Sequence, residues 1–161
     1  MDMNPQRIYQ HYNPGRLIFG PKSLNQLAKE IPPGEIPLVI TDQGVSRSGI
    51  LQKVTGVLDG AGIHHHVFDG IEPDPPMEVV AKAVSLYQKR GCTLVIGLGG
   101  GSSIDGAKAV SLMASRQGDI REYAAGKVID GELVPICAIP TTAGTGSEVT
   151  GIAVITDREN K

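Results

Sequence analysis

The chain alternates between short apolar runs and amphipathic segments. Apolar runs at 36–41, 94–98 and 134–139 are long enough for buried strands and too short for helices. Two further runs, at 63–68 and 152–156, also predict strands. Apolar residues recur at helical spacing in the segments 24–31, 50–61, 80–87 and 104–115. This strand–helix repetition predicts an α/β fold with a doubly wound, mostly parallel sheet.

A small β-hairpin is expected ahead of this sheet. The polar-apolar segment 6–12 and the segment 16–20 flank Asn13-Pro14-Gly15, which is typical of a turn. Pro32-Pro33-Gly34 then ends the first helix.

Composition narrows the class of protein. A length of 161 residues fits one domain, and an aromatic content of 4% without Trp predicts a core of aliphatic side chains, as in covered parallel sheets. A net charge of −2 provides no basic field for nucleic acid. No apolar run approaches the roughly 20 residues that cross a bilayer, and the first twelve residues lack the apolar core of a secretion signal. We therefore expect a cytoplasmic protein without nucleic-acid or membrane partners.

A glycine-rich segment joins a predicted strand to a predicted helix. Gly97-Leu98-Gly99-Gly100-Gly101-Ser102 lets backbone N–H groups approach an anion where the helix start adds unpaired donors. We expect Ser102 to be the N-cap, Asp105 its capping-box partner, and Lys108 to lie one turn further on the same face. The pattern is neither a Walker loop nor the usual dinucleotide fingerprint. Close helix–sheet packing alone would also explain the glycines.

A second segment rich in hydroxyl groups follows the strand at 134–139. Pro140 is followed by Thr141, Thr142, Thr145, Ser147 and Thr150, separated by small residues that keep the backbone accessible. Such a loop is also typical of a solvated turn. Because both loops leave the carboxyl ends of apolar strands, we expect them to converge on one crevice.

The sequences GGGSSIDGAKA (99–109) and PTTAGTGSEVT (140–150) together resemble the paired signatures of the iron-dependent (group III) alcohol dehydrogenases. The resemblance covers nearly the whole chain. It implies a Rossmann-like, dehydroquinate synthase-like dinucleotide-binding domain over residues 1–161. It also implies hydride transfer between a primary alcohol or its aldehyde and nicotinamide.

The resemblance also assigns residues. Gly99, Gly100, Gly101 and Ser102 would bind the pyrophosphate, and Thr141, Thr142 and Thr145 would line the rest of the cofactor groove. Ser147 and Thr150 would contact the nicotinamide or ribose side. Asp42 matches an acid that hydrogen-bonds the adenosine ribose in relatives, which favours NAD over NADP. A strand-end Asp is also a common turn residue. Asp74 stands where relatives place Asn, and it is retained as a cofactor candidate.

The family's iron ligands, an Asp and three His, belong to a helical C-terminal domain that this chain does not reach. No residue here is assigned to the metal, and Fe²⁺ is expected only with that domain. His64-His65-His66 lies in a predicted strand, so His64 and His66 share a face and could bind a metal adventitiously.

Three functions fit these observations. The first is the cofactor-binding part of the dehydrogenase, inactive without the helical domain. The second is a non-catalytic nucleotide-binding module or short paralogue, and the third is a sugar- or phosphate-binding α/β protein. Exposed apolar surface where the helical domain would lie predicts a homo-oligomer.

Overall fold

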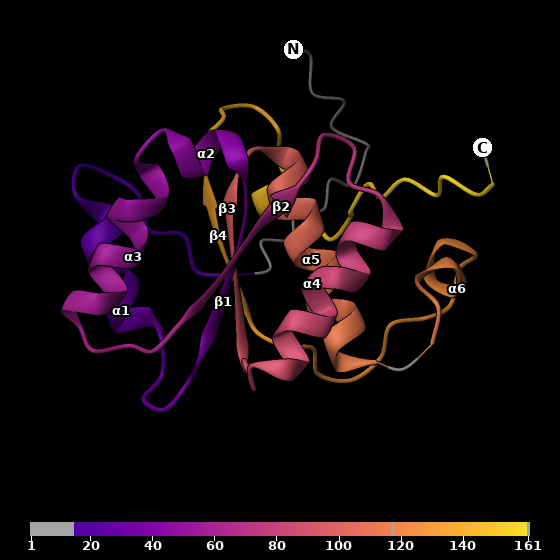
Figure 1. Ribbon diagram of the computed structural model, residues 1–161, viewed down its shortest axis with the longest axis horizontal. Helices are drawn as coiled ribbons and strands as arrows, with labels where there is room; N and C mark the ends of the chain where they lie inside the picture. The colour runs from indigo at the N-terminus through magenta and orange to yellow at the C-terminus, as the bar shows by residue number, and fades with distance from the viewer. Residues whose placement is uncertain (1–14, 117, 161) are drawn as a thin grey trace, which may run out of the picture.

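The computed structural model describes residues 15–116 and 118–160, and within them the chain forms a four-stranded sheet covered by helices (Figure 1). The strands are β1 (Pro37–Asp42), β2 (His66–Ile71), β3 (Leu94–Gly99) and β4 (Ile136–Pro140). The helices are η1 (Ser23–Gln26), α1 (Leu27–Glu30), α2 (Gln43–Arg47), α3 (Ile50–Gly60), α4 (Met77–Lys89), α5 (Gly101–Ser115), α6 (Ile120–Ala124) and η2 (Ser147–Val149). The predicted doubly wound α/β fold is confirmed.

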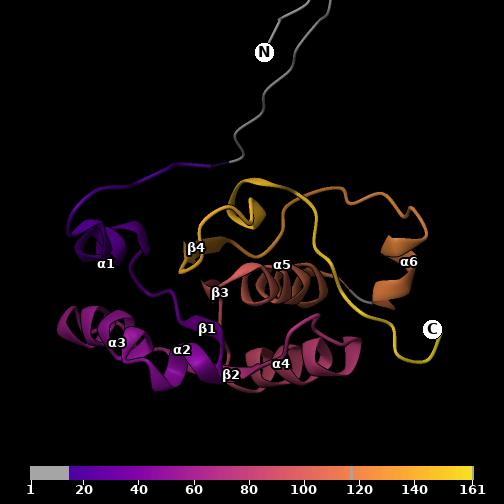
Figure 2. The same ribbon diagram turned by 90° about the horizontal axis from the view of Figure 1, so that it is seen from above.

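The order of the strands is β2-β1-β3-β4, and every neighbouring pair is parallel. The connection from β1 to β2 runs through α3 on one face, whereas α4 and α5 lie on the other face (Figures 1 and 2). The chain therefore reverses its direction of winding between β1 and β3. In open α/β sheets this switch point, at the carboxyl ends of the strands, is where ligands bind.

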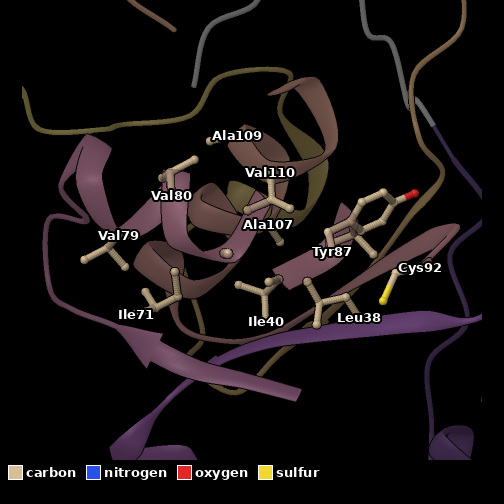
Figure 3. Close-up of a cluster of buried hydrophobic side chains, with 12 residues drawn as sticks. Leu38, Ile40, Ile71, Val79, Val80, Tyr87, Cys92, Ala107, Ala109 and Val110 are labelled. Carbon is tan, nitrogen blue, oxygen red and sulfur yellow. The ribbon is translucent and has the colours of Figure 1, made fainter. Parts of the chain in front are cut away.

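Two hydrophobic clusters hold the layers together. Leu38 and Ile40 of β1 pack toward α4 and α5, and Val39 between them packs toward α1 and α3. Figure 3 shows the first cluster, in which Leu38 and Ile40 point toward Tyr87, Ala107 and Val110. Because both faces of β1 are covered, its side chains do not alternate between apolar and polar.

The structure also corrects several boundaries. β2 begins at His66 instead of residue 63 and extends to Ile71. Residues 152–156 form no strand, and only Thr156 makes a bridge, to Pro76, since side chains of α5 bind the backbone of this segment instead. The short helices α2 and α6 were not predicted. Each begins at an aspartate whose carboxylate accepts a backbone N–H, Asp42 from Val45 and Asp119 from Arg121.

The predicted hairpin is wrong in the part that the structure describes. Residues 6–12 and most of the turn lie outside the described residues. Residues 16–20 belong to no strand, and the Leu17 and Phe19 side chains are 64% and 83% exposed. This segment lies beside no described strand, so its backbone finds no ladder to join.

Within residues 15–116 and 118–160, no helix combines the length and the apolar character that crossing a bilayer requires.

The contact between β3 and α5 is close enough to test by substitution. A Cβ at Gly97 would lie 2.8 Å from the Cβ of Ala107 and 3.4 Å from the Cα of Ile104. We expect Gly97→Ala to lower the free energy of unfolding by about 1–3 kcal/mol, because helix or strand must shift. Gly56→Ala is the control, since nothing lies within 4 Å of a Cβ there. Because this position of the helix is exposed, Gly56→Ala should raise the free energy of unfolding by roughly 0.4–1 kcal/mol. Urea unfolding of both variants measures the difference, and equal stabilities would contradict the close packing.

Candidate functional site

Two loops leave the sheet side by side at the switch point. Gly99 at the end of β3 pairs with Pro140 at the end of β4. The backbone N–H of Thr141 then donates to the carbonyl oxygen of Gly99 at 2.9 Å. The glycine and threonine segments therefore lie side by side as predicted, whereas the crevice expected between them stays a prediction.

Helix α5 starts directly after the glycine turn with unpaired backbone donors. Its N-cap is Gly100, and no side chain caps it. The first hydrogen bond of the helix runs from the Ile104 N–H to the Gly100 carbonyl oxygen at 3.1 Å, so the N–H groups of residues 101–103 have no helical partner. These donors and the helix dipole make this end of α5 suited to an anion.

The expected capping box is wrong. Ser102 lies inside α5 because the helix begins at Gly101, one residue earlier than a Ser102 cap requires. Asp105 consequently lies beyond the first turn, where it cannot reach back to a cap residue. Its carboxylate binds Lys108 and the backbone N–H of Val154 instead.

The turn has no room for side chains. Gly99 has a φ of +148°, and a Cβ there would lie 2.5 Å from the Ser103 Oγ. A Cβ at Gly100 would lie 3.2 Å from the Thr142 Oγ1, and one at Gly101 would lie 3.3 Å from the Ser147 Oγ. The hydroxyl groups of the second loop thus lie against the start of α5.

The threonine loop is open to solvent where it faces away from α5. Thr141, Thr142 and Thr145 are exposed, whereas Ser147 at the start of η2 is buried. The Thr145 Oγ1 donates to the Glu148 carboxylate at 3.2 Å, which fixes the turn before η2. The exposed hydroxyl groups can donate to a ligand that approaches from the solvent side.

A partly buried ion pair ties the end of this loop to α5. The Lys108 Nζ lies 3.2 Å from the Asp105 Oδ1, 3.4 Å from the Thr150 Oγ1 and 2.7 Å from the Ile152 carbonyl oxygen. The Asp105 Oδ2 accepts the Val154 N–H at 3.1 Å. Lys108 and Asp105 therefore act on the chain 42 to 49 residues further on, a role that the helical spacing did not reveal.

Asp42 lies at the end of β1, on the other side of the switch point. Its Oδ1 accepts the Val45 N–H at 2.9 Å and its Oδ2 accepts the Ser103 hydroxyl at 3.0 Å. Asp42 is thus both the N-cap of α2 and a neighbour of the glycine turn. The contact to Ser103 was missed at the sequence level, because residues 61 positions apart give no local signal.

Asp74 is exposed in the segment that joins β2 to α4. Its φ of +48° is left-handed, a conformation that Asp and Asn adopt more readily than other residues with a side chain. No described hydrogen bond connects Asp74 to the glycine turn or the threonine loop. The described hydrogen bonds therefore do not link Asp74 to the candidate site.

His64 and His66 lie together as the strand alternation predicts. Their rings are 4.8 Å apart between centroids, although His64 precedes β2. Burial, then the neighbouring His64 and Arg90, lowers the pKa of His66. Among residues 15–116 and 118–160, no group of three or more His, Cys, Asp or Glu side chains could hold a metal ion. The described residues thus do not fit an iron site.

Two cavities lie away from these loops. One of about 440 Å³ lies between Pro32–Glu35 and Ala61–His64, and one of about 640 Å³ lies between α4 and α6. Neither is lined by the glycine turn, so the candidate site is the open surface made by the two loops.

The anchoring role of Lys108 predicts a local loss of structure. In Lys108→Met the stem still packs, but Thr150 and Ile152 lose their partner and Asp105 is left without its cation. We expect the free energy of unfolding to fall by about 1–3 kcal/mol. Hydrogen exchange at the Val154 amide should also accelerate. Lys127→Met, which breaks an exposed ion pair with Glu122, is the control. It should change neither the free energy of unfolding nor the hydrogen exchange at Val154. Unaltered exchange at Val154 in Lys108→Met would contradict the anchor.

Comparison with known proteins agrees with the resemblance seen in the sequence. Residues 14–161 match the family model of iron-containing alcohol dehydrogenases. A choline dehydrogenase of Bacillus subtilis is 42% identical over 127 residues, which are 77% of this chain and 32% of that protein. A 1,3-propanediol dehydrogenase of Klebsiella pneumoniae is 33% identical over 96% of this chain and 41% of its own length.

Structural similarity extends over nearly the whole chain. The crystal structure of a sulfoacetaldehyde reductase from Bifidobacterium kashiwanohense in complex with NAD⁺ superposes with a TM-score of 0.83 and 30% identity, over 95% of this chain and 41% of that one. The chain spans about a third to two fifths of the length of these relatives. The match over residues 14–161 shows that the chain belongs to the iron-containing alcohol dehydrogenase family.

Proposed function

We propose that this chain is the dinucleotide-binding part of an NAD-dependent alcohol dehydrogenase, which transfers hydride between an alcohol or its aldehyde and nicotinamide. The observation that carries the proposal is the uncapped start of α5, with the threonine loop packed beside it. The relatives support it, since they include dehydrogenases of small alcohols and a reductase bound to NAD⁺.

The pyrophosphate of the cofactor would lie against the glycine turn. The N–H groups of Gly101, Ser102 and Ser103 would donate to its oxygens, and the glycines at 99 and 100 would let the phosphate approach the backbone. The exposed hydroxyl groups of Thr141 and Thr142 would donate from the opposite side, and Thr145, whose hydroxyl donates to Glu148, would line the groove. The residues present thus offer the hydrogen-bond donors that a diphosphate would need.

The adenosine ribose would bind at Asp42. Both carboxylate oxygens already accept one hydrogen bond, and each keeps a second lone pair for a ribose hydroxyl. A 2′-phosphate would meet the same carboxylate and be repelled, so NAD is favoured over NADP. Asp74 would be a further ribose acceptor, on the segment after β2.

Ser147 and Thr150 would contact the nicotinamide side. The Ser147 hydroxyl adjoins the position of a Gly101 Cβ, and Thr150 is held by Lys108. Bound NAD would supply the hydride acceptor or donor, and these side chains would orient it. No step is assigned to iron, because the described residues do not fit a metal site. Since the chain covers about two fifths of its relatives, we propose that it binds cofactor and needs further residues for turnover.

The predicted homo-oligomer stays a prediction. The exposed apolar side chains of Ile136, Ile152 and Val154, with 41%, 71% and 63% of their surface accessible, support it.

The proposal predicts that Gly101→Asp weakens NADH binding at least tenfold without unfolding the chain. An acidic side chain in the first turn favours the helix dipole, but its charge occupies the place of the phosphate. Titration by NADH fluorescence should show saturable binding to the original chain and at least tenfold weaker binding to Gly101→Asp. A Cβ at Gly101 would lie 3.3 Å from the Ser147 Oγ, so the variant should melt at a lower temperature, but still cooperatively and above the temperature of the titration.

Gly56→Asp is the matched control, because it adds the same charge at an exposed position of α3. It should bind NADH as the original chain does. An original chain that does not bind NADH, or a Gly101→Asp variant that binds it equally well, would refute the proposed site.

A further inference from the structure

We infer that Ser103 strengthens the preference for NAD over NADP that Asp42 provides, by holding the Asp42 carboxylate in place. This inference rests on the proposed function, because it concerns how the proposed ribose acceptor is oriented.

The Asp42 carboxylate is held at both oxygens. The Ser103 hydroxyl donates to the Oδ2 at 3.0 Å, and the backbone N–H of Val45 donates to the Oδ1 at 2.9 Å. Ser103 is 2% exposed, so the donor of this bond is buried, whereas the Asp42 carboxylate that accepts it is only half-buried. One donor comes from α2 and the other from α5, so the carboxylate bridges the two helices that leave the switch point.

The surroundings of the carboxylate leave no space for side chains but leave its acceptors free. A Cβ at Gly44 would lie 2.9 Å from the Asp42 Oδ1, and a Cβ at Gly99 would lie 3.2 Å from the Oδ2. The Gly99 position is also 2.5 Å from the Ser103 Oγ, so a side chain there would displace the hydroxyl. Glycine at both positions is what allows Asp42 and Ser103 to meet.

A carboxylate with both oxygens fixed distinguishes two cofactors better than a mobile one. It presents aligned acceptors to the ribose hydroxyls, and it cannot turn away from a 2′-phosphate without breaking the bond to Ser103. Without that hydroxyl, Asp42 keeps only the bond to Val45 and can rotate about its terminal torsion, which is broad for Asp. NADH then loses part of its pre-organised acceptor, and NADPH meets a weaker repulsion.

The test is Ser103→Ala in the 161-residue chain, with dissociation constants for NADH and NADPH measured by cofactor fluorescence. The NADPH-to-NADH ratio of dissociation constants should fall roughly three- to tenfold, which lies within the range for the net contribution of one ordinary hydrogen bond. Ser103→Cys, a similar volume with a weaker donor, should lower the ratio in the same direction. An unchanged ratio in both variants would overturn the inference.

Ser111→Ala is the matched control. Ser111 is also a buried serine of α5, 3% exposed, and its hydroxyl donates to the Val134 carbonyl oxygen at 2.6 Å, far along the helix from the glycine turn. It should leave the ratio unchanged, and a fall equal to that of Ser103→Ala would show a general effect of loosening α5 and refute the specific role.

A double-mutant cycle separates the two residues further. In an Asp42→Ala background, Ser103→Ala should leave the ratio unchanged, because no carboxylate remains to be oriented. A further fall in that background would show that Ser103 acts without Asp42. An original chain that binds neither cofactor would refute the proposed function itself, whereas normal NADH binding with an unaltered ratio refutes only the role of Ser103.

Discussion

The close approach of α5 to β3 is the constraint on which the rest of the structure depends. A Cβ at Gly97 of β3 would lie 2.8 Å from the Cβ of Ala107 in α5. The same helix also lies close to β2, since a Cβ at Gly106 would lie 2.8 Å from the Cδ1 of Ile71. Only Gly100 separates the end of β3 at Gly99 from the start of α5 at Gly101. The first backbone N–H groups of α5 therefore lie at the edge of the sheet and have no partner within the helix. Glycine at 97 and 106 thus serves packing, and the same packing places the free amides that the proposed binding requires, so the two interpretations of the motif do not exclude each other.

The second loop depends on the first. One backbone hydrogen bond, from Thr141 to Gly99, places it beside the turn, and the Asp105–Lys108 pair holds its far end against α5. Asp42 reaches the same place from β1 through Ser103. Three segments that are far apart in the chain are therefore fixed around one helix end, and the loops need little ordering when a ligand binds.

The sequence predicts the strands and long helices because their apolar spacing is local, as in 36–41 and 104–115. It also predicts both loops of the candidate site. The predictions that were wrong concern segments whose structure depends on contacts with residues far away in the chain. Residues 152–156 have strand propensity, yet Lys108 and Asp105 bind their backbone. Ser102 has the composition of a cap, yet close packing starts α5 at Gly101. Asp42 and Asp119 are typical N-cap residues, but no helix was predicted after either of them. The contact of Ser103 with Asp42 could not be predicted, because no local sequence pattern indicates it.

The central claim is that the backbone amides at the start of α5 bind the diphosphate of NAD. A ¹H–¹⁵N NMR titration of the chain with NAD⁺ observes these amides directly. The largest shifts are expected at the amides of residues 100–103 and 141–145, and the amides of residues 158–160 should not shift. Saturable shifts confined to the cavity between Pro32–Glu35 and Ala61–His64, with the amides of residues 100–103 unchanged, would contradict it.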